Sequence, residues 1–238
     1  KRNNFSQAKT RFIIIFITLQ EYKMIEDLDN FPNKIPIFPL SGVVMFPNTY
    51  LPLNIFETRY INMFNHALTS EHKLIGMIQT VSEQTNKDEI KLYDVGCAGR
   101  IMKFEETEDN RFLITLKGVS RFNLISDKTS IHNFKIAEVN WNKFEEDLKQ
   151  TKNNSSHETL KETLKKYFYL KKFKVDMNII DKCNDYNLAD QLTMICPLTS
   201  EEKQMLLETH SLSKRNQLLL SIIEISNREL DTSDVIKH

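Results

Sequence analysis

Glycine is scarce in this chain, with five residues among 238, and cysteine is scarcer still, with three. Cys97, Cys183 and Cys196 are an odd number, lie far apart and form no CxxC pair. This set argues against a disulfide framework and against a zinc site, and it favours a reducing compartment, which we take to be the cytoplasm. A phosphate-binding glycine loop is excluded as well, because no GxxxxGK[ST] pattern occurs.

An excess of either charge is also missing. Lysine and arginine number 32, aspartate and glutamate number 32, and the net charge at pH 7 is zero. A balanced chain has no global attraction for nucleic acid or for an anionic membrane. We therefore expect neither as a partner.

Long hydrophobic runs are absent too. The longest run near the N-terminus, Phe12 to Leu19, is shorter than the roughly 20 residues that a membrane span needs, and no small-residue cleavage site follows it. The printed sequence starts with Lys1 and reaches a methionine at Met24. We hypothesise that residues 1–34 are an N-terminal leader in which native translation starts at Met24, so that residues 1–23 are upstream translation or a mis-set start. A weak membrane anchor and an extra edge strand are the alternatives, which the intact mass of the native protein distinguishes.

Common catalytic motifs are also missing from the sequence. Neither HExxH nor GxSxG occurs. His66 and His72 read as solvent-facing histidines rather than metal ligands, and the apolar neighbours of Cys97 predict a buried, unreactive thiol. The acidic runs Glu105 to Asp109 and Glu145 to Asp147 are typical of solvated turns. We therefore expect no catalytic residue, no metal and no cofactor, which favours a binding function.

The chain has two successive patterns of apolar residues, which we call its first and second texture. From residue 35 to 148 the apolar pattern is short and strand-like with one helical interruption, and from residue 158 to 238 it has helical spacing. Residues 149–157 between them are polar and read as a linker. The sequence predicts an α+β protein with two subdomains.

The first texture predicts about six strands and one helix. Four of the six prolines lie between Ile35 and Tyr60, and Pro52 confines the strand over residues 51–56 to an edge or an end of the sheet. Apolar residues at three- and four-residue steps predict a helix over residues 56–69. Strands are expected at 73–81, on both sides of a turn at Glu108 to Asn110, and at 134–141.

In the second arm of this hairpin, Phe112, Ile114 and Leu116 should be buried and Leu113, Thr115 and Lys117 should lie on the wetter face. Because Gly96, Gly99 and Gly118 lie in these strands, where glycine marks bulges and corners, we expect a small closed or half-closed barrel.

The second texture predicts a helical bundle. Helices are expected from residue 160 to about 173 and over residues 176–186, 188–195, 200–208 and 212–230. Pro197 should end the helix before it, and Thr199 or Ser200 should cap the helix after it.

Three stretches together resemble a known family. IPIFPLSGVVMFPNTYLPLNIFETRY, then LIGMIQ, then LYDVGCAGRIMKFEETEDNRFLITLKGVSRFNLI look like the N-terminal substrate-recognition domain of the ATP-dependent Lon protease. The resemblance runs from Ile35 to the last helix, and it implies a PUA-like β pseudo-barrel with one inserted helix, followed by a C-terminal helical bundle. Ser41 and Asn48 stand where the family often has Pro and Gly, which loosens two turns without changing the fold.

The resemblance also implies what this sequence does. Neither the Walker motif nor the Ser-Lys dyad of full-length Lon is in the sequence, so the chain resembles the small stand-alone Lon N-domain proteins of bacteria and is expected not to be an enzyme. The implied function is recognition of exposed hydrophobic segments of unfolded or tagged proteins, as an adaptor in protein quality control, with Lon itself or another protease as a further partner. The sequence leaves the oligomeric state open.

The candidate binding residues come from the proline-rich opening and the helix after it. A path stiffened by prolines can display apolar surface without collapsing, and aromatic and Met-rich surfaces suit permissive recognition. The candidate peptide-binding set is Phe46, Tyr50, Leu53, Phe56, Tyr60 and Met63. The alternative is that apolar residues here fill the core, a reading that covers Phe38, Leu40, Phe46, Leu53 and Phe56.

Four charged residues match the family motifs: Glu57, Arg59, Arg100 and Arg121. Charged groups among apolar neighbours need partners, so we expect Glu57 to pair with one of the arginines at the barrel edge, in a structural role.

Two other functions stay open. Lys161 to Val175 has six lysines against one glutamate, with Tyr167, Phe168 and Tyr169 among them. Such a segment can bind single-stranded RNA, and a solvated helix face is the alternative. The other function is a scaffold for a single folded partner.

Overall fold

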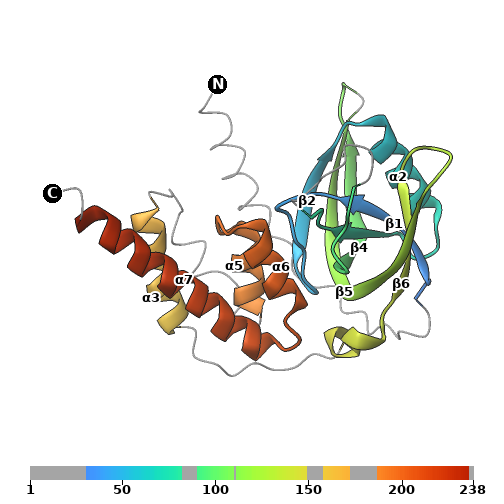
Figure 1. Cartoon of the computed structure of the whole chain (residues 1–238). Helices are drawn as coiled ribbons and strands as arrows, with labels where there is room; N and C mark the ends of the chain where they lie inside the picture. Colours follow the sequence, from blue (N-terminus) through green and yellow to red (C-terminus); the bar gives the residue numbers. More distant parts are fainter. Residues whose placement is uncertain (1–30, 82–89, 110, 149–157, 172–186, 236–238) are drawn as a thin grey trace. The chain divides into compact units, whose positions relative to one another are not determined.

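The computed structural model describes residues 31–81, 90–109, 111–148, 158–171 and 187–235 (Figure 1). The expected leader up to residue 30, the linker, the helix over residues 176–186 and Cys183 lie outside these residues. The chain divides into two compact units. We call the described residues 31–148 with Pro197–Glu208 the sheet unit, and the remaining described residues the helical unit.

Residues 31–148 of the sheet unit form six strands, one helix and a short 3-10 segment in the part that the structure describes. Their bounds are β1 Lys34–Pro39, β2 Tyr50–Ile55, α2 Thr58–Thr69, β3 Leu74–Ile78, β4 Val95–Glu106, β5 Phe112–Thr129, β6 Lys135–Asn140 and η2 Asn142–Leu148. The expected number of strands, the inserted helix and the hairpin turn after β4 are confirmed.

The sheet closes on itself through its longest strand. The strand order is β2-β5-β4-β3-β1-β6, and β5 pairs with β6 as well as with β4. Its first half also pairs with β2, from Ile55 opposite Phe112 to Tyr50 opposite Lys117. β2 is therefore the end strand, as Pro52 predicted, because a proline cannot donate a ladder hydrogen bond.

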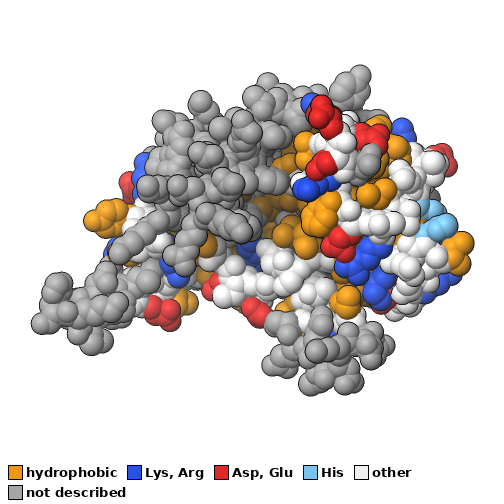
Figure 2. Space-filling view, turned by 90° about the horizontal axis from the view of Figure 1, so that it is seen from above, with side chains coloured by type: hydrophobic (Ala, Val, Ile, Leu, Met, Phe, Trp, Pro, Cys, Tyr) orange, Lys and Arg blue, Asp and Glu red, His pale blue; other side chains and the backbone are white. Residues whose placement is uncertain are grey.

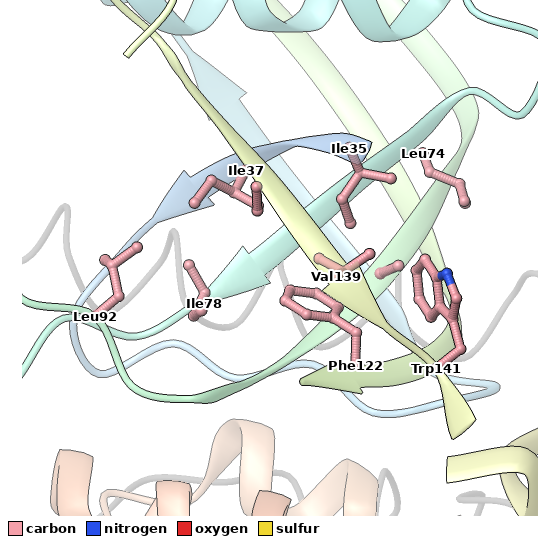
Figure 3. Close-up of a cluster of buried hydrophobic side chains, with 10 residues drawn as sticks. Ile35, Ile37, Leu74, Ile78, Leu92, Phe122, Val139 and Trp141 are labelled. Carbon is pink, nitrogen blue, oxygen red and sulfur yellow. The ribbon is translucent and has the colours of Figure 1, made fainter. Parts of the chain in front are cut away.

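A cluster of buried hydrophobic side chains lies inside the closed sheet (Figure 3). Ile35 and Ile37 from β1 approach Phe122 from β5 and Val139 from β6, and Trp141 closes one end. The Trp141 ring lies edge-on to Phe122, with centroids 5.9 Å apart. Strands from the two ends of the sheet-forming segment thus share one core, which favours the closed arrangement by burying apolar area.

α2 covers this unit with an amphipathic face. Its buried residues Met63, Phe64 and Ala67 fall at one- and three-residue steps on one side, and the helix packs on β1 and β3 while the Phe64 ring reaches β4 and β5. The helix begins at Thr58 rather than at Phe56, so Phe56 lies in the connection between β2 and α2.

The proline-rich segment makes a tight turn against β5. Thr49 N–H donates to the Phe46 carbonyl over 3.2 Å, and Asn48 between them has φ +60°. Pro47 followed by a residue with positive φ is the pattern of a type II turn, in which Gly or Asn is favoured. Asn48 therefore fills the place where the family often has glycine without breaking the turn.

α6, Ser200–Glu208, belongs to the sheet unit. It begins with a capping box, in which Glu202 N–H donates to Thr199 Oγ1 over 3.1 Å and Thr199 N–H donates to Glu202 Oε2 over 2.7 Å. Its Gln204 side chain donates to the Val95 carbonyl and accepts from Gln79 Nε2. The expected division at residue 158 placed this helix with the others, but a polar network holds it on the sheet.

A buried ion pair completes the sheet unit. Arg121 on β5 meets Asp147 of η2 at 2.7 Å, with both side chains at most 5% exposed. The guanidinium also donates to the Leu207 carbonyl at the end of α6 and lies 4.4 Å from the Phe144 ring centroid. One side chain thus links β5, η2 and α6.

The helical unit contains α3 Glu158–Leu170, α5 Leu188–Ile195 and α7 Leu212–Val235. α7 packs against both of the others. A second buried pair joins α5 to α7, with Arg215 donating to the two oxygens of Asp190 over 2.6 and 2.9 Å. α5 ends before Pro197 as predicted, and no helix in the described part of the chain is long and apolar enough to cross a membrane.

Candidate functional site

Four of the large hydrophobic side chains that are exposed lie along the β4–β5 hairpin and at the end of β2 beside it. They are Phe56, Met102, Phe104 and Leu113, and Phe56 is the most exposed of them at 61%. Figure 2 looks down on this hairpin end and shows hydrophobic side chains at the surface beside acidic and basic ones. We call these four residues the hairpin-end surface. A group of this kind is a candidate binding site, because single exposed hydrophobics are ordinary but clusters are not.

Strand register explains why these side chains are neighbours. Leu113 of β5 lies opposite Asn54 of β2 on one side and Glu105 of β4 on the other. Phe56 follows the last β2 pair, Ile55 with Phe112, and so stands beside Arg111. Adjacent strands are about 4.8 Å apart, so Phe56 and Leu113 lie within reach of each other on one face of the hairpin.

The opposite face of the hairpin is lined by aromatic rings. Phe104 pairs with Ile114 in the ladder, and its ring centroid lies 5.4 Å from that of the buried Phe64 on α2. The Phe64 ring also lies 5.0 Å from the half-buried Phe112. The rigid core thus supports Phe104, which remains 47% exposed.

Arginines lie against the aromatic rings at this end of the unit. The Arg111 guanidinium is 5.7 Å from the Phe56 ring centroid and 2.7 Å from Asp109. Arg59 lies 4.6 Å from the Tyr60 ring centroid and 2.8 Å from Glu57. Cations over ring faces are weakly attracted by the ring quadrupole. The Phe56 ring of the hairpin-end surface therefore already has a guanidinium beside it, and so does the Tyr60 ring nearby.

Two ionisable groups here have shifted pKa values. The hydrogen bond that Thr107 donates to Asp109, helped by the nearby Arg111, lowers the pKa of the Asp109 carboxyl. Burial raises the pKa of Tyr60, an effect that Arg59 partly opposes. Asp109 is thus held ionised in the turn, and Tyr60 is held neutral.

The six predicted binding residues do not form one groove. Phe46 and Met63 are fully buried and offer no surface to a ligand, as the core alternative expected for Phe46 but not for Met63. Tyr50 is the first residue of β2 and Phe56 directly follows its last one, so the strand rise puts them about 20 Å apart. Leu53 is half-buried on the inner face opposite Ile114.

Tyr60 is half-buried and faces β1, with its ring centroid 4.1 Å from that of Phe38. Of the six, Phe56 alone is fully at the surface.

The four charged residues have three different environments. Glu57 pairs with Arg59, and the pair is exposed. Arg121 instead pairs with Asp147 in the interior, a partner that the sequence motifs did not indicate. Arg100 donates to the His72 carbonyl over 2.5 Å.

Phe104, Leu113 and Met102 were missed as binding candidates. Leu113 had one usable signal, since it is a leucine on the predicted wetter face of the hairpin, and its exposure of 44% agrees with that face. Phe104 had none, because whether an aromatic near a strand end is covered depends on distant helices.

The other sequence candidates stay apart from this surface. Cys97 is buried in β4, and no cluster of metal-binding residues exists among the described residues. In α3, Tyr167 and Phe168 are buried, so Tyr169 is the exposed aromatic among the three near the lysines. A stacking platform for single strands needs more exposed rings than this.

Known proteins with sequences similar to this chain are Lon proteases. A family model for the ATP-dependent protease La (LON) substrate-binding domain matches residues 34–224. The Lon protease of Buchnera aphidicola subsp. Acyrthosiphon pisum (strain APS) is 24% identical over 208 residues, which cover 86% of this chain and 26% of that protein. The Lon protease of Fervidobacterium nodosum is 27% identical over 212 residues, covering 83% and 25%. The chain thus spans about a quarter of the length of these relatives.

Solved structures show the same fold. The Lon N-terminal domain protein from Xanthomonas campestris aligns with a TM-score of 0.55 at 19% identity, covering 79% of this chain and 97% of that one. The N-terminal domain of Mycobacterium avium complex Lon protease aligns with a TM-score of 0.52 at 14% identity, covering 80% and 98%. The fold is mixed α and β, with a six-stranded sheet and several helices. Because the family model covers more than half of its residues, the chain belongs to the Lon substrate-binding domain family.

Proposed function

We propose that this protein recognises polypeptides, binding exposed hydrophobic segments of unfolded or tagged proteins as an adaptor in protein quality control. Membership of a substrate-binding family supports a substrate-recognition role. The observation that carries the proposal further is that Phe56 and Leu113 are exposed side by side on one face of a closed, rigid sheet, with Phe104 exposed on the other face. We take the closed sheet with α2 to be the PUA-like pseudo-barrel of this family, followed by a C-terminal bundle.

The hairpin-end surface suits this role for a physical reason. Phe104 and Leu113 are on paired strands and Phe56 directly follows the last pair of β2, so little conformational entropy is lost when they bind. Aromatic side chains contribute large contact areas and are enriched in binding interfaces. We propose no catalytic role, and the matched region is the substrate-binding part of a much longer protease.

The test compares an unfolded protein with its own folded form. The full chain is titrated against a fluorescently labelled protein kept unfolded by reduction and alkylation, and against the folded original, at low and moderate salt. We expect the unfolded form to bind selectively and the binding to tolerate salt. Replacing Phe56 and Leu113 by serine should weaken binding about tenfold, a loss typical of central interface residues.

A matched control uses another exposed apolar residue. Ile131 in the β5–β6 turn is 91% exposed and lies in neither the hairpin end nor α2, so Ile131→Ser should leave binding unchanged. Equal losses in both variants would contradict the assignment of the surface. Binding that disappears with salt would indicate RNA-like electrostatic recognition instead, and no binding to either form would favour a scaffold for a single folded partner.

A further inference from the structure

The hairpin-end surface is bordered by carboxylates. From Lys103 to Arg111 the sequence contains four acidic and two basic residues. Asp109 is paired with Arg111. The other three acids, Glu105, Glu106 and Glu108, are exposed, and none forms an ion pair with another described residue.

Strand register places two of these carboxylates beside apolar side chains. Glu105 lies directly opposite Leu113, and Glu106 lies directly opposite Phe112. Directly opposed residues have Cβ atoms about 5 Å apart. Successive residues of a strand point to opposite faces, so each face of the hairpin end has an apolar side chain with a carboxylate next to it. Lys103 lies two residues further along β4, opposite Thr115.

The protein itself shows which chemistry this arrangement accepts. The Arg111 guanidinium lies between a carboxylate, Asp109 at 2.7 Å, and an aromatic ring, Phe56 at 5.7 Å. At the edge of this surface, a guanidinium of the protein itself thus contacts a carboxylate and an aromatic ring at the same time. Unpaired carboxylates beside further apolar side chains offer the same combination to a cation from outside.

We propose that the hairpin-end surface prefers extended polypeptide segments in which a large apolar side chain has lysine or arginine beside it. This inference rests on the proposed function and names its substrate class. The apolar side chain packs on Phe56 and Leu113, which share one face of the hairpin, and the neighbouring cation lies near Glu105, opposite Leu113, or near Glu108 in the turn. Segments with acidic residues beside the apolar one are disfavoured, because their carboxylates face these same carboxylates.

The test uses three labelled unstructured peptides with one shared phenylalanine-leucine centre. The centre is flanked by lysines in the first, by serines in the second and by glutamates in the third, and binding to the full chain is followed by fluorescence anisotropy. We expect the lysine-flanked peptide to bind about fivefold more tightly than the serine-flanked one, as expected for two exposed charge contacts. The glutamate-flanked peptide should bind most weakly, and the differences should shrink as salt is raised.

Two triple variants with the same charge change locate the preference. Glu105→Gln, Glu106→Gln and Glu108→Gln together should make the lysine- and serine-flanked peptides bind equally, with affinity for the serine-flanked peptide retained. The control triple, Glu71→Gln, Glu145→Gln and Glu162→Gln, changes exposed acids elsewhere and should keep the preference. A control triple that also loses the preference would assign the effect to net charge and overturn the proposal.

The outcomes separate this inference from the proposed function. If all three peptides bind equally, or the glutamate-flanked one binds best, the charge preference is wrong while polypeptide recognition stands. If no peptide binds and the unfolded protein does not bind either, the proposed function is wrong and the preference falls with it.

Discussion

Gly118 is the glycine that another stretch of backbone approaches most closely. A Cβ atom there would lie 1.9 Å from the Phe46 carbonyl oxygen. The same glycine donates to the Thr49 carbonyl and accepts from Asn48 N–H, so the proline-rich turn is seated on its backbone. A side chain at this position would push the turn off β5.

We therefore expect Gly118→Ala to lower the free energy of unfolding by on the order of 3 kcal/mol, measured by urea denaturation. Gly42→Ala is the control. Gly42 has φ +74° but its Cβ would meet nothing closer than Ser200 Oγ at 3.6 Å, so its cost should be limited to about 1 kcal/mol of backbone strain. Similar costs at the two positions would contradict the close approach.

Asp109 provides a residue-scale prediction about pH. Its pKa is lowered first by the Thr107 hydrogen bond and less by Arg111, so Thr107→Val should move the pKa of Asp109 back up toward that of an ordinary aspartate. Because the folded-state pKa lies below the unfolded-state one, the bond stabilises the turn above the unfolded-state pKa and is lost as pH falls through the folded-state pKa. Carboxyl chemical shifts measured by NMR against pH check this, and an unchanged midpoint in the variant would contradict the cause.

Among the secondary-structure elements, η2 and α6 are held to β5 by the Arg121–Asp147 pair. Asp147→Ala leaves a buried guanidinium that has lost its carboxylate. Such losses cost about 3–5 kcal/mol, while Glu57→Gln at the exposed pair should cost less than about 1 kcal/mol. Thermal or urea unfolding measures both, and equal effects would show that the interior pair is no stronger than the surface one.

A double replacement separates the pair's net value from the cost of leaving one partner alone. Arg121→Met with Asp147→Leu removes both charges, and we expect it to recover much of the stability lost in Asp147→Ala. If the double variant is as unstable as the single one, the hydrogen bond from Arg121 to the Leu207 carbonyl contributes most of the effect.

On the scale of the whole molecule, each unit has its own buried ion pair. The helical unit has Asp190 with Arg215, and the sheet unit has Arg121 with Asp147. We expect Asp190→Ala to speed amide hydrogen exchange in α5 and α7 while leaving the β-strands protected. Loss of protection throughout both units at once would show that they unfold as one.

α5 and α6 were expected with the same bounds that the structure shows, because Pro197 and the Thr199 cap are local signals. The edge position of β2 followed from Pro52 alone. The candidate site was predicted less well, since Phe56 of its six residues is at the surface while Phe46 and Met63 are core.

The amino-acid order by itself determined most of the elements, the ends that prolines and caps mark, and the family, since periodicity, prolines, caps and motifs act within a few residues of each other. Tertiary structure alone decided which apolar side chains remain exposed, as at Phe104, and which partner a buried charge finds, as Arg121 finds Asp147. It also decided that α6 lies with the sheet unit. Burial and pairing depend on segments far apart in the chain, such as those of Arg121 and Leu207, which are 86 positions apart, and local patterns do not specify which distant segments meet.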